Sequence, residues 1–227
     1  MTDKKTTVSE HLIELRSRLL KSIIFLILAF IVCYFFSDKI YNFLVEPYAQ
    51  AVKDDGNNRR LIFTALHETF LTYLKLAFFS AFFFSCPIIL MQIWKFVAPG
   101  LYKDEKLALL PFLVATPILF LLGGMLVYYL IMPIAINFFL SFESVSTNGS
   151  LPIQLEAKVN EYLSLIMRLI LAFGISFQLP IFLTLLAKVG FITSEYLRTR
   201  RKYVVIIIFS MAALLTPPDP ITQIGLA

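Results

Sequence analysis

Four long runs of apolar residues constrain the fold of this chain more than any other feature. They cover residues 19–36, 70–94, 107–142 and 159–187. Their charged side chains are Lys21, Lys75, Glu161 and Arg168. A helix needs about 20 mostly apolar residues to cross a bilayer, and it satisfies its own backbone hydrogen bonds in lipid. The runs predict an all-α integral membrane protein, a polytopic bundle formed by one domain over residues 1–227.

The composition leads to the same conclusion. Apolar residues make up 59% of the chain and charged residues only 15%, against about 45–50% and about 25% in a typical soluble domain. So few charged side chains cannot cover the surface of a water-soluble globule.

The long runs are expected to be kinked. The run 107–142 would be about 54 Å long as one straight helix, so it must tilt, bend or protrude from the bilayer. Prolines interrupt the runs, and a proline inside a helix removes a backbone hydrogen bond. These prolines are Pro87, Pro111, Pro117, Pro133 and Pro180. We expect a concave, glove-like bundle, although proline is also simply common in membrane helices.

The distribution of basic residues predicts the orientation. Thirteen of the 20 lysines and arginines lie in the N-terminal segment and in the second and fourth connections. Short loops rich in lysine and arginine stay in the cytoplasm, so the N-terminus is expected there.

Enzyme chemistry finds no support in the motifs. The chain has two histidines, and its two cysteines, Cys33 and Cys86, lie within apolar runs. No metalloprotease, nucleophile-elbow or phosphate-loop motif is present in the sequence. We therefore expect no catalytic residues, no metal and no cofactor.

The segment before the first run, SEHLIELRSRLLKS, forms an amphipathic helical pattern. Arg16 projects from its apolar face, which predicts an ionic clasp between Arg16 and a neighbouring loop. Glu14 lies on the polar face, where Arg18 at i+4 is its expected partner.

Four motifs, taken in order, carry a resemblance to a known family. They are HLIELRSRL, QIWKFVAPGLYKDEK, FGISFQLP and LLTPPD. Together they resemble the TatC family, the multispanning subunit of the twin-arginine protein translocase. The resemblance implies six helices, of which the fifth matches the short run 203–215, and the sixth would begin at about residue 221, where this chain ends.

The family resemblance also implies a function and partners. The chain would be a receptor in the cytoplasmic (inner) membrane of a prokaryote, and it would bind twin-arginine signal peptides of folded proteins. It would assemble with TatB-like and TatA-like single-span proteins, and with further copies of itself, into a translocase driven by the proton-motive force. No nucleic acid is implied.

The resemblance assigns roles to individual residues. Signal-peptide binding falls on two acids, Glu14 and Glu105, with Arg16 and Phe96 in the same cytoplasmic motifs. The functional loops carry Pro47, Pro99 and Asp219.

Partner docking is expected at Gln178, Ala213 and Thr216. The family often has glutamate where this chain has Gln178, which favours hydrogen bonding to a partner helix over proton relay. The alternative is a contact within the helix that Pro180 kinks.

Two questions stay open at this stage. A proton-coupled small-molecule transporter is the alternative function, although the sequence shows no inverted repeat and few charges inside the runs. Arg168 matches no family position, and it either extends toward the membrane interface or pairs with Glu161.

Overall fold

The computed structural model describes residues 8–53, 60–97, 103–144, 151, 153–188, 190, 192–216 and 219–227, and these are almost wholly helical. The elements are α1 (Val8–Phe35), α2 (Ser37–Ala51), α3 (Glu68–Val97), α4 (Lys103–Leu126), the π-helix η3 (Val127–Ile131), α5 (Met132–Leu140), α6 (Val159–Ser176), α7 (Leu179–Lys188), α8 (Ser194–Thr199), α9 (Arg201–Leu215) and α10 (Pro220–Leu226). Isolated bridges join Ile62 to Lys158 and Ser144 to Ile153.

Four stretches within the described residues are long and apolar enough to cross a membrane. They are Leu12–Phe35, Glu68–Ile93, Pro111–Leu140 and Val159–Ala187. Each coincides with one of the apolar runs of the sequence. The protein is therefore a multi-pass membrane protein, and the expected fold class, a polytopic bundle of kinked helices, is confirmed.

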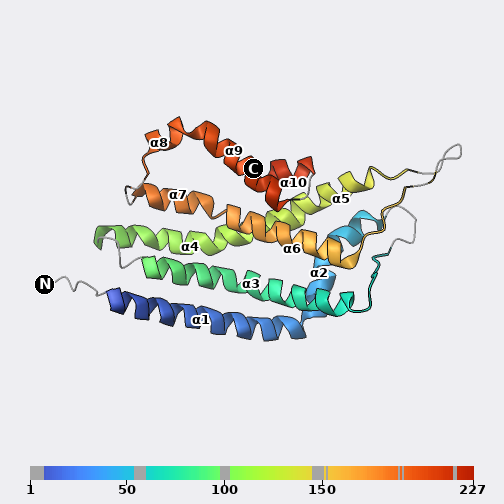
Figure 1. Ribbon diagram of the computed structural model, residues 1–227, viewed down its shortest axis with the longest axis horizontal. Helices are drawn as coiled ribbons and strands as arrows, with labels where there is room; N and C mark the ends of the chain where they lie inside the picture. Colours follow the sequence, from blue (N-terminus) through green and yellow to red (C-terminus); the bar gives the residue numbers. More distant parts are fainter. Residues whose placement is uncertain are drawn as a thin grey trace.

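The long helices lie side by side in the order α1, α3, α4 and α6 (Figure 1). Helix α1 is outermost and packs along α3, and α3 also contacts α4 and α6. Most large apolar side chains of α1 are exposed, including Leu12, Leu19 and Ile27. Such a surface suits lipid, because apolar side chains gain nothing from leaving hydrocarbon.

Two of the four spans change direction within the bilayer. The run 107–142 forms α4, η3 and α5, and α5 turns away from the axis of α4 (Figure 1). The bend combines a π-helical turn with Pro133 at the start of α5, and both features are recognised causes of kinks. The run 159–187 breaks between α6 and α7, just before Pro180.

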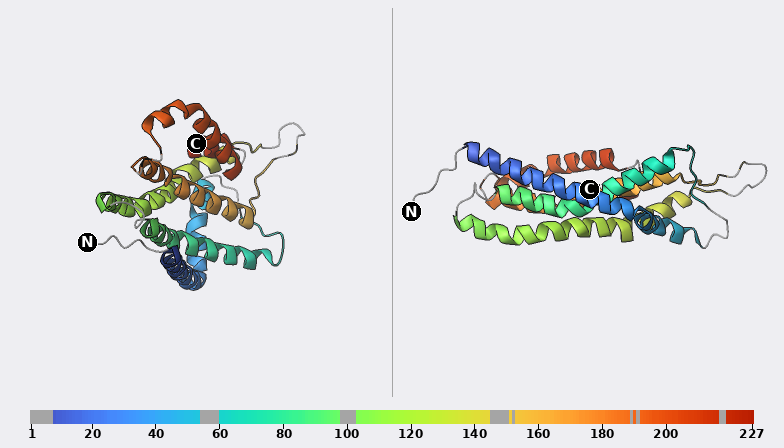
Figure 2. Two further views of the ribbon diagram at one scale, coloured as in Figure 1. Left: turned by 60° about the vertical axis from the view of Figure 1, so that its left-hand side comes forward. Right: turned by 90° about the horizontal axis from the view of Figure 1, so that it is seen from below.

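Helix α2 closes one end of the bundle, which we call the α2 end; α1 begins at the opposite, N-terminal end (Figures 1 and 2). The main hydrophobic core lies near the α2 end, where Tyr48 of α2 packs with Val127 of η3 and Ile166 of α6. Pro47 lies inside α2 and is buried. Because Pro47 has no N–H, it cannot donate to the carbonyl of Phe43, four residues earlier.

Two tyrosines bond to carbonyls in this part of α2. Tyr128 of η3 donates its hydroxyl to the Phe43 carbonyl at 2.7 Å, and Tyr162 of α6 donates to the Leu44 carbonyl at 2.9 Å. The rings of Phe43 and Tyr128 are also stacked, with centroids 4.3 Å apart. The proline thus leaves a backbone acceptor that ties α2 to the spanning helices.

Helices α4 and α6 approach each other closely at two glycines. A Cβ atom at Gly123 would lie 2.8 Å from the Phe173 carbonyl oxygen, and one at Gly174 would lie 2.8 Å from the Phe120 ring. Small residues at helix contacts allow this approach in membranes.

Candidate functional site

Helix α1 turns its polar face toward α3 near the N-terminal end. Glu14 and Arg18 are half-buried and Ser22 is buried, whereas the apolar Leu15 and Leu19 on the other face are exposed. In a soluble protein the apolar face of such a helix would be buried. Here the charged face is sheltered inside the bundle, which brings ionic groups of α1 to the end of α3.

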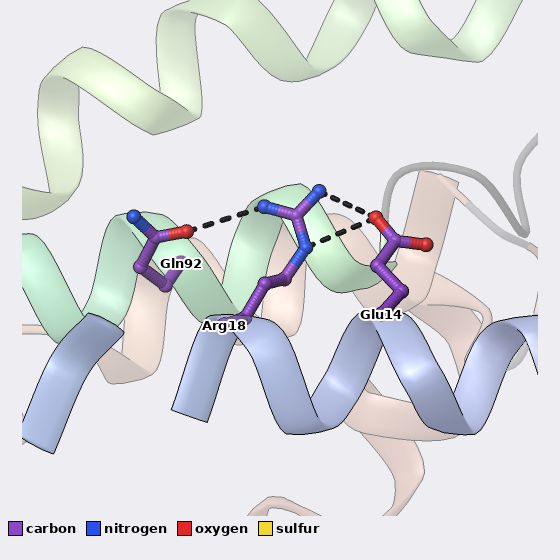
Figure 3. A network of polar contacts seen from close by, with 3 residues as sticks. All are labelled: Glu14, Arg18 and Gln92. Carbon is purple, nitrogen blue, oxygen red and sulfur yellow. Dashed lines mark hydrogen bonds and ion pairs between the residues drawn. The ribbon is translucent and has the colours of Figure 1, made fainter. Parts of the chain in front are cut away.

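Arg18 links the carboxylate of Glu14 to helix α3 (Figure 3). Its Nε and Nη2 atoms donate to Glu14 Oε1 at 3.0 and 2.5 Å, and its Nη1 atom donates to Gln92 Oε1 at 3.2 Å. The expected i+4 pair of Glu14 and Arg18 is therefore present. The contact with Gln92 also fixes the position of the carboxylate relative to α3.

Gln92 was not among the residues that the sequence selected. It stands in the QIWKF motif, two residues before Trp94. The feature of the sequence that could have indicated a role for Gln92 is an amide near the end of an apolar run. Amides are also common at membrane boundaries, so this feature does not single the residue out.

The other expected signal-peptide residues are less fully described. Phe96 is half-buried at the end of α3, and Arg16 is exposed on α1. Glu105 belongs to the first turns of α4, but its side chain lies outside the described part, as does Pro99 altogether. Among the described residues Arg16 has no ion-pair partner, so its clasp to a loop stays a prediction.

Gln178 lies at the break between α6 and α7. Its Nε2 atom donates to the Thr116 carbonyl of α4 at 3.0 Å. Its Oε1 atom is buried and has no hydrogen-bond partner among the described residues. This hydrogen bond of the amide therefore runs between helices, to α4, and not within the helix that Pro180 kinks.

Ala213 and Thr216 occupy different environments at the end of α9. Ala213 is exposed, whereas Thr216 is buried and donates its hydroxyl to the Ala212 carbonyl at 2.9 Å.

Asp219 is buried and caps α10. It accepts from the Thr222 N–H at 2.8 Å and from the Thr222 hydroxyl at 2.7 Å, so its position in the fold is that of a helix N-cap. A short helix, α10, runs from Pro220 to Leu226, in the part of the chain where a sixth helix was expected to begin.

No group of three or more histidine, cysteine, aspartate or glutamate side chains in the described part of the chain could hold a metal ion. What the described polar groups offer is a carboxylate held by a guanidinium at the N-terminal end and an amide between α4 and α7. Both are suited to binding peptide or helix groups by hydrogen bonds.

Comparison with known protein families shows to which family the chain belongs. The profile of the family described as Sec-independent protein translocase protein (TatC) matches residues 10–227. The chain belongs to the TatC family. Relatives named Sec-independent protein translocase protein TatC include those of Magnetococcus marinus (47% identical over 99% of this chain and 80% of the relative), Rickettsia prowazekii (44%, 99% and 88%) and Escherichia coli K12 (37%, 96% and 81%).

A solved structure agrees with this assignment. The TatC-family chain superposes on a crystal structure described as the twin-arginine translocase receptor TatC with a TM-score of 0.78 and 33% identity, covering 96% of this chain and 91% of that one. The family and these relatives are named as translocase proteins, so they give the transporter alternative no support.

Proposed function

We propose that this chain is the signal-peptide receptor and core component of a twin-arginine translocase, which exports folded proteins across the cytoplasmic membrane with the proton-motive force. Membership of the TatC family supports the proposal. The observation that carries it is the Glu14 carboxylate, held against α3 by Arg18 in a half-buried position at the N-terminal end.

Glu14 and Glu105 are the proposed recognition groups for the two arginines. A guanidinium group is planar and forks onto a carboxylate with two hydrogen bonds, whereas a lysine ammonium acts as a point charge. Two carboxylates on separate helices, α1 and α4, would therefore distinguish paired arginines from paired lysines. Phe96 and Arg16 belong to the same proposed surface.

Charge alone cannot account for the affinity of such a receptor. An exposed ion pair contributes about 0–1 kcal/mol, and micromolar binding requires about 8 kcal/mol. The apolar stretch of the signal peptide must supply most of the rest. Exposed apolar side chains near the Glu14–Arg18 pair, such as Leu15 of α1 and Ile93 of α3, provide surface for it.

The proposal also covers the orientation of the receptor in the membrane and its protein partners. The N-terminal end would face the cytoplasm of a prokaryote, because the basic residues concentrate in the connections at this end. TatA-like and TatB-like single-span proteins would dock at Gln178, Ala213 and Thr216, and further copies of the chain would join the same complex. Pro47 would act from inside α2, Asp219 as the N-cap of α10, and Pro99 in the connection between α3 and α4.

The test measures binding of a fluorescent twin-arginine signal peptide to purified receptor. Glu14→Gln and Glu105→Gln keep side-chain size but remove charge, and each should weaken binding about fivefold, the equivalent of about 1 kcal/mol. The matched control is Glu46→Gln, which alters an exposed carboxylate at the α2 end that accepts a hydrogen bond from Gln50. It should leave affinity unchanged.

The double variant gives the decisive result. Glu14→Gln with Glu105→Gln should bind twin-arginine and twin-lysine peptides about equally, because no carboxylate remains to read the guanidinium groups. Normal affinity and normal crosslinking of the twin-arginine peptide in a folded double variant would contradict the assignment of Glu14 and Glu105 as the arginine-binding groups.

A further inference from the structure

Arg168 is a charged side chain within a membrane span. It is exposed on α6, on a narrow face that it shares with Glu161 and Ile175, each seven residues away. Among the described residues none makes a hydrogen bond or ion pair with it: Glu161, the nearest acid on this face, pairs instead with Lys158 at 3.6 Å. A guanidinium without a protein partner in a span requires an anion or water.

A second cation lies beside this face. Lys75 of α3 is exposed, and its Nζ atom donates to Asn160 Oδ1 at 3.1 Å. The Ser164 hydroxyl contacts the same oxygen at 3.5 Å. We call Lys75, Asn160, Ser164 and Arg168 the donor track. The Asn160 Oδ1 atom already accepts from Lys75 and Ser164. The groups of the donor track that can still bind a ligand are therefore mainly the N–H donors of its two cations.

The depth of both cations matches the boundary of the hydrocarbon at the α2 end. The span Val159–Ala187 would be about 43 Å long if straight, which exceeds a hydrocarbon layer of about 30 Å by roughly 6–7 Å at each end. Arg168 is about 14 Å along this span from Val159, so its Cα lies about 7 Å inside the boundary. The same reasoning places Lys75, about 10 Å from Glu68, about 6 Å inside.

Long basic side chains at this depth extend toward the interface and place their charge there. Cβ atoms on a helix also point toward its N-terminus, and α3 and α6 both begin at the α2 end. Both cationic groups are therefore directed to the level at which lipid phosphates lie.

We propose that Arg168 and Lys75 bind the phosphate of a phospholipid in the leaflet at the α2 end. Phosphate oxygens only accept hydrogen bonds, and the donor track offers mainly donors, so the chemistries are complementary. The exposed Ile175, further into the membrane on the face of Arg168, would lie along an acyl chain. The proposal does not depend on the proposed function of the receptor.

The experiment compares two lipids with the same acyl chains, of which only one carries a phosphate-containing headgroup. Delipidated protein is titrated with dioleoyl phosphatidylglycerol or with dioleoylglycerol, and bound lipid is counted by native mass spectrometry. The natural chain should bind the phospholipid about tenfold more tightly, and Arg168→Gln with Lys75→Gln should remove this preference. Arg168→Lys should retain part of it, because charge persists without the planar fork.

Lys39→Gln is the matched control. Lys39 is an exposed lysine of α2, beside the Phe36 ring, so this change removes one charge at the same end without touching the donor track. It should keep the preference for the phospholipid. Equal binding of the two lipids by the natural chain, or an undiminished preference in a double variant with unchanged thermal unfolding, would overturn the proposal.

Discussion

At the scale of single residues, Pro47 has a structural role that the sequence did not reveal. The resemblance assigned it to a functional loop, but it lies buried inside α2, and the carbonyl four residues before it accepts the hydroxyl of Tyr128. The stacked ring of Phe43 adds to the same contact. If the Phe43 carbonyl lost this partner, it would have no helical N–H to replace it.

We expect Tyr128→Phe to lower the free energy of unfolding by about 0.5–1.5 kcal/mol, the usual net contribution of one intramolecular hydrogen bond. Thermal unfolding in detergent measures this change. Tyr129→Phe is the matched control, since Tyr129 is the next residue of η3 and is exposed. Its effect should stay within about 0.5 kcal/mol.

The combination with Pro47→Ala tests the mechanism. An alanine at this position regains an N–H that can bond to the Phe43 carbonyl, so Tyr128→Phe should cost about 1 kcal/mol less in that background. Additive effects of the two substitutions would show that the tyrosine acts by packing alone.

At the scale of helices, the contact between α4 and α6 depends on the absence of side chains at two glycines. In the sequence, the pair Gly123-Gly124 lies inside the long apolar run 107–142. In the structure, Gly123 faces the backbone of α6, whereas Gly124 faces the ring of Phe83 at 3.0 Å.

We expect Gly123→Ala to destabilise the protein by about 1–3 kcal/mol, because the added methyl meets backbone atoms that cannot rotate away. Gly225→Ala is a suitable comparison: its new methyl would meet the end of the Ile131 side chain at 3.0 Å, which can move. Its effect should be clearly smaller. Equal unfolding temperatures for the two variants would contradict the close backbone contact.

Gln178 joins α4 to α7 and so belongs to the same scale. Its donor end is occupied by Thr116, and its buried acceptor end has no described partner. We expect Gln178→Leu to reduce disulfide crosslinking between a cysteine at Ala213 and the helix of a single-span partner, while leaving signal-peptide binding intact. Gln178→Glu should be tolerated, because a carboxyl group in the membrane stays protonated and keeps both hydrogen-bonding functions.

Undiminished crosslinking in Gln178→Leu would instead mean that the amide serves only the contact between α4 and α7. A crosslinking loss that is accompanied by a lower unfolding temperature of Gln178→Leu would support the same interpretation. Signal-peptide affinity measured on the same samples separates these outcomes from unfolding.

At the scale of the whole molecule, the sequence predicted the membrane class, the four long spans and the family. The family followed from the four sequence motifs, whereas hydropathy is sufficient for the membrane class and the spans, because lipid allows so few backbone conformations. It could not predict the partners of polar side chains, such as Gln92 with Arg18 or Gln178 with Thr116. These contacts depend on how helices far apart in sequence are rotated against each other, and periodicity within one helix does not contain that information.

The orientation in the membrane is a prediction for the whole chain. In a variant with Cys33→Ala and Cys86→Ala, a cysteine at the fully exposed Leu66 of the α2 end should react with an impermeant thiol reagent in intact cells. A cysteine at the exposed Arg198, at the opposite end, should react only after the cells are opened. Labelling of position 198 in intact cells would reverse the proposed topology.

The guanidinium of Arg18 has a consequence for how a substrate is selected. A peptide arginine that forks onto Glu14 needs both carboxylate oxygens, and Arg18 already holds Oε1 with two N–H groups. At this position a peptide guanidinium would compete with Arg18 for the carboxylate, so the net gain from the new ion pair would stay near the value of about 1 kcal/mol expected for an exposed pair. A peptide lysine that replaced Arg18 would offer a single point charge in place of the two N–H groups that a guanidinium donates to the carboxylate. In the proposed site, Arg18 would therefore be the internal competitor that an incoming side chain has to displace from Glu14.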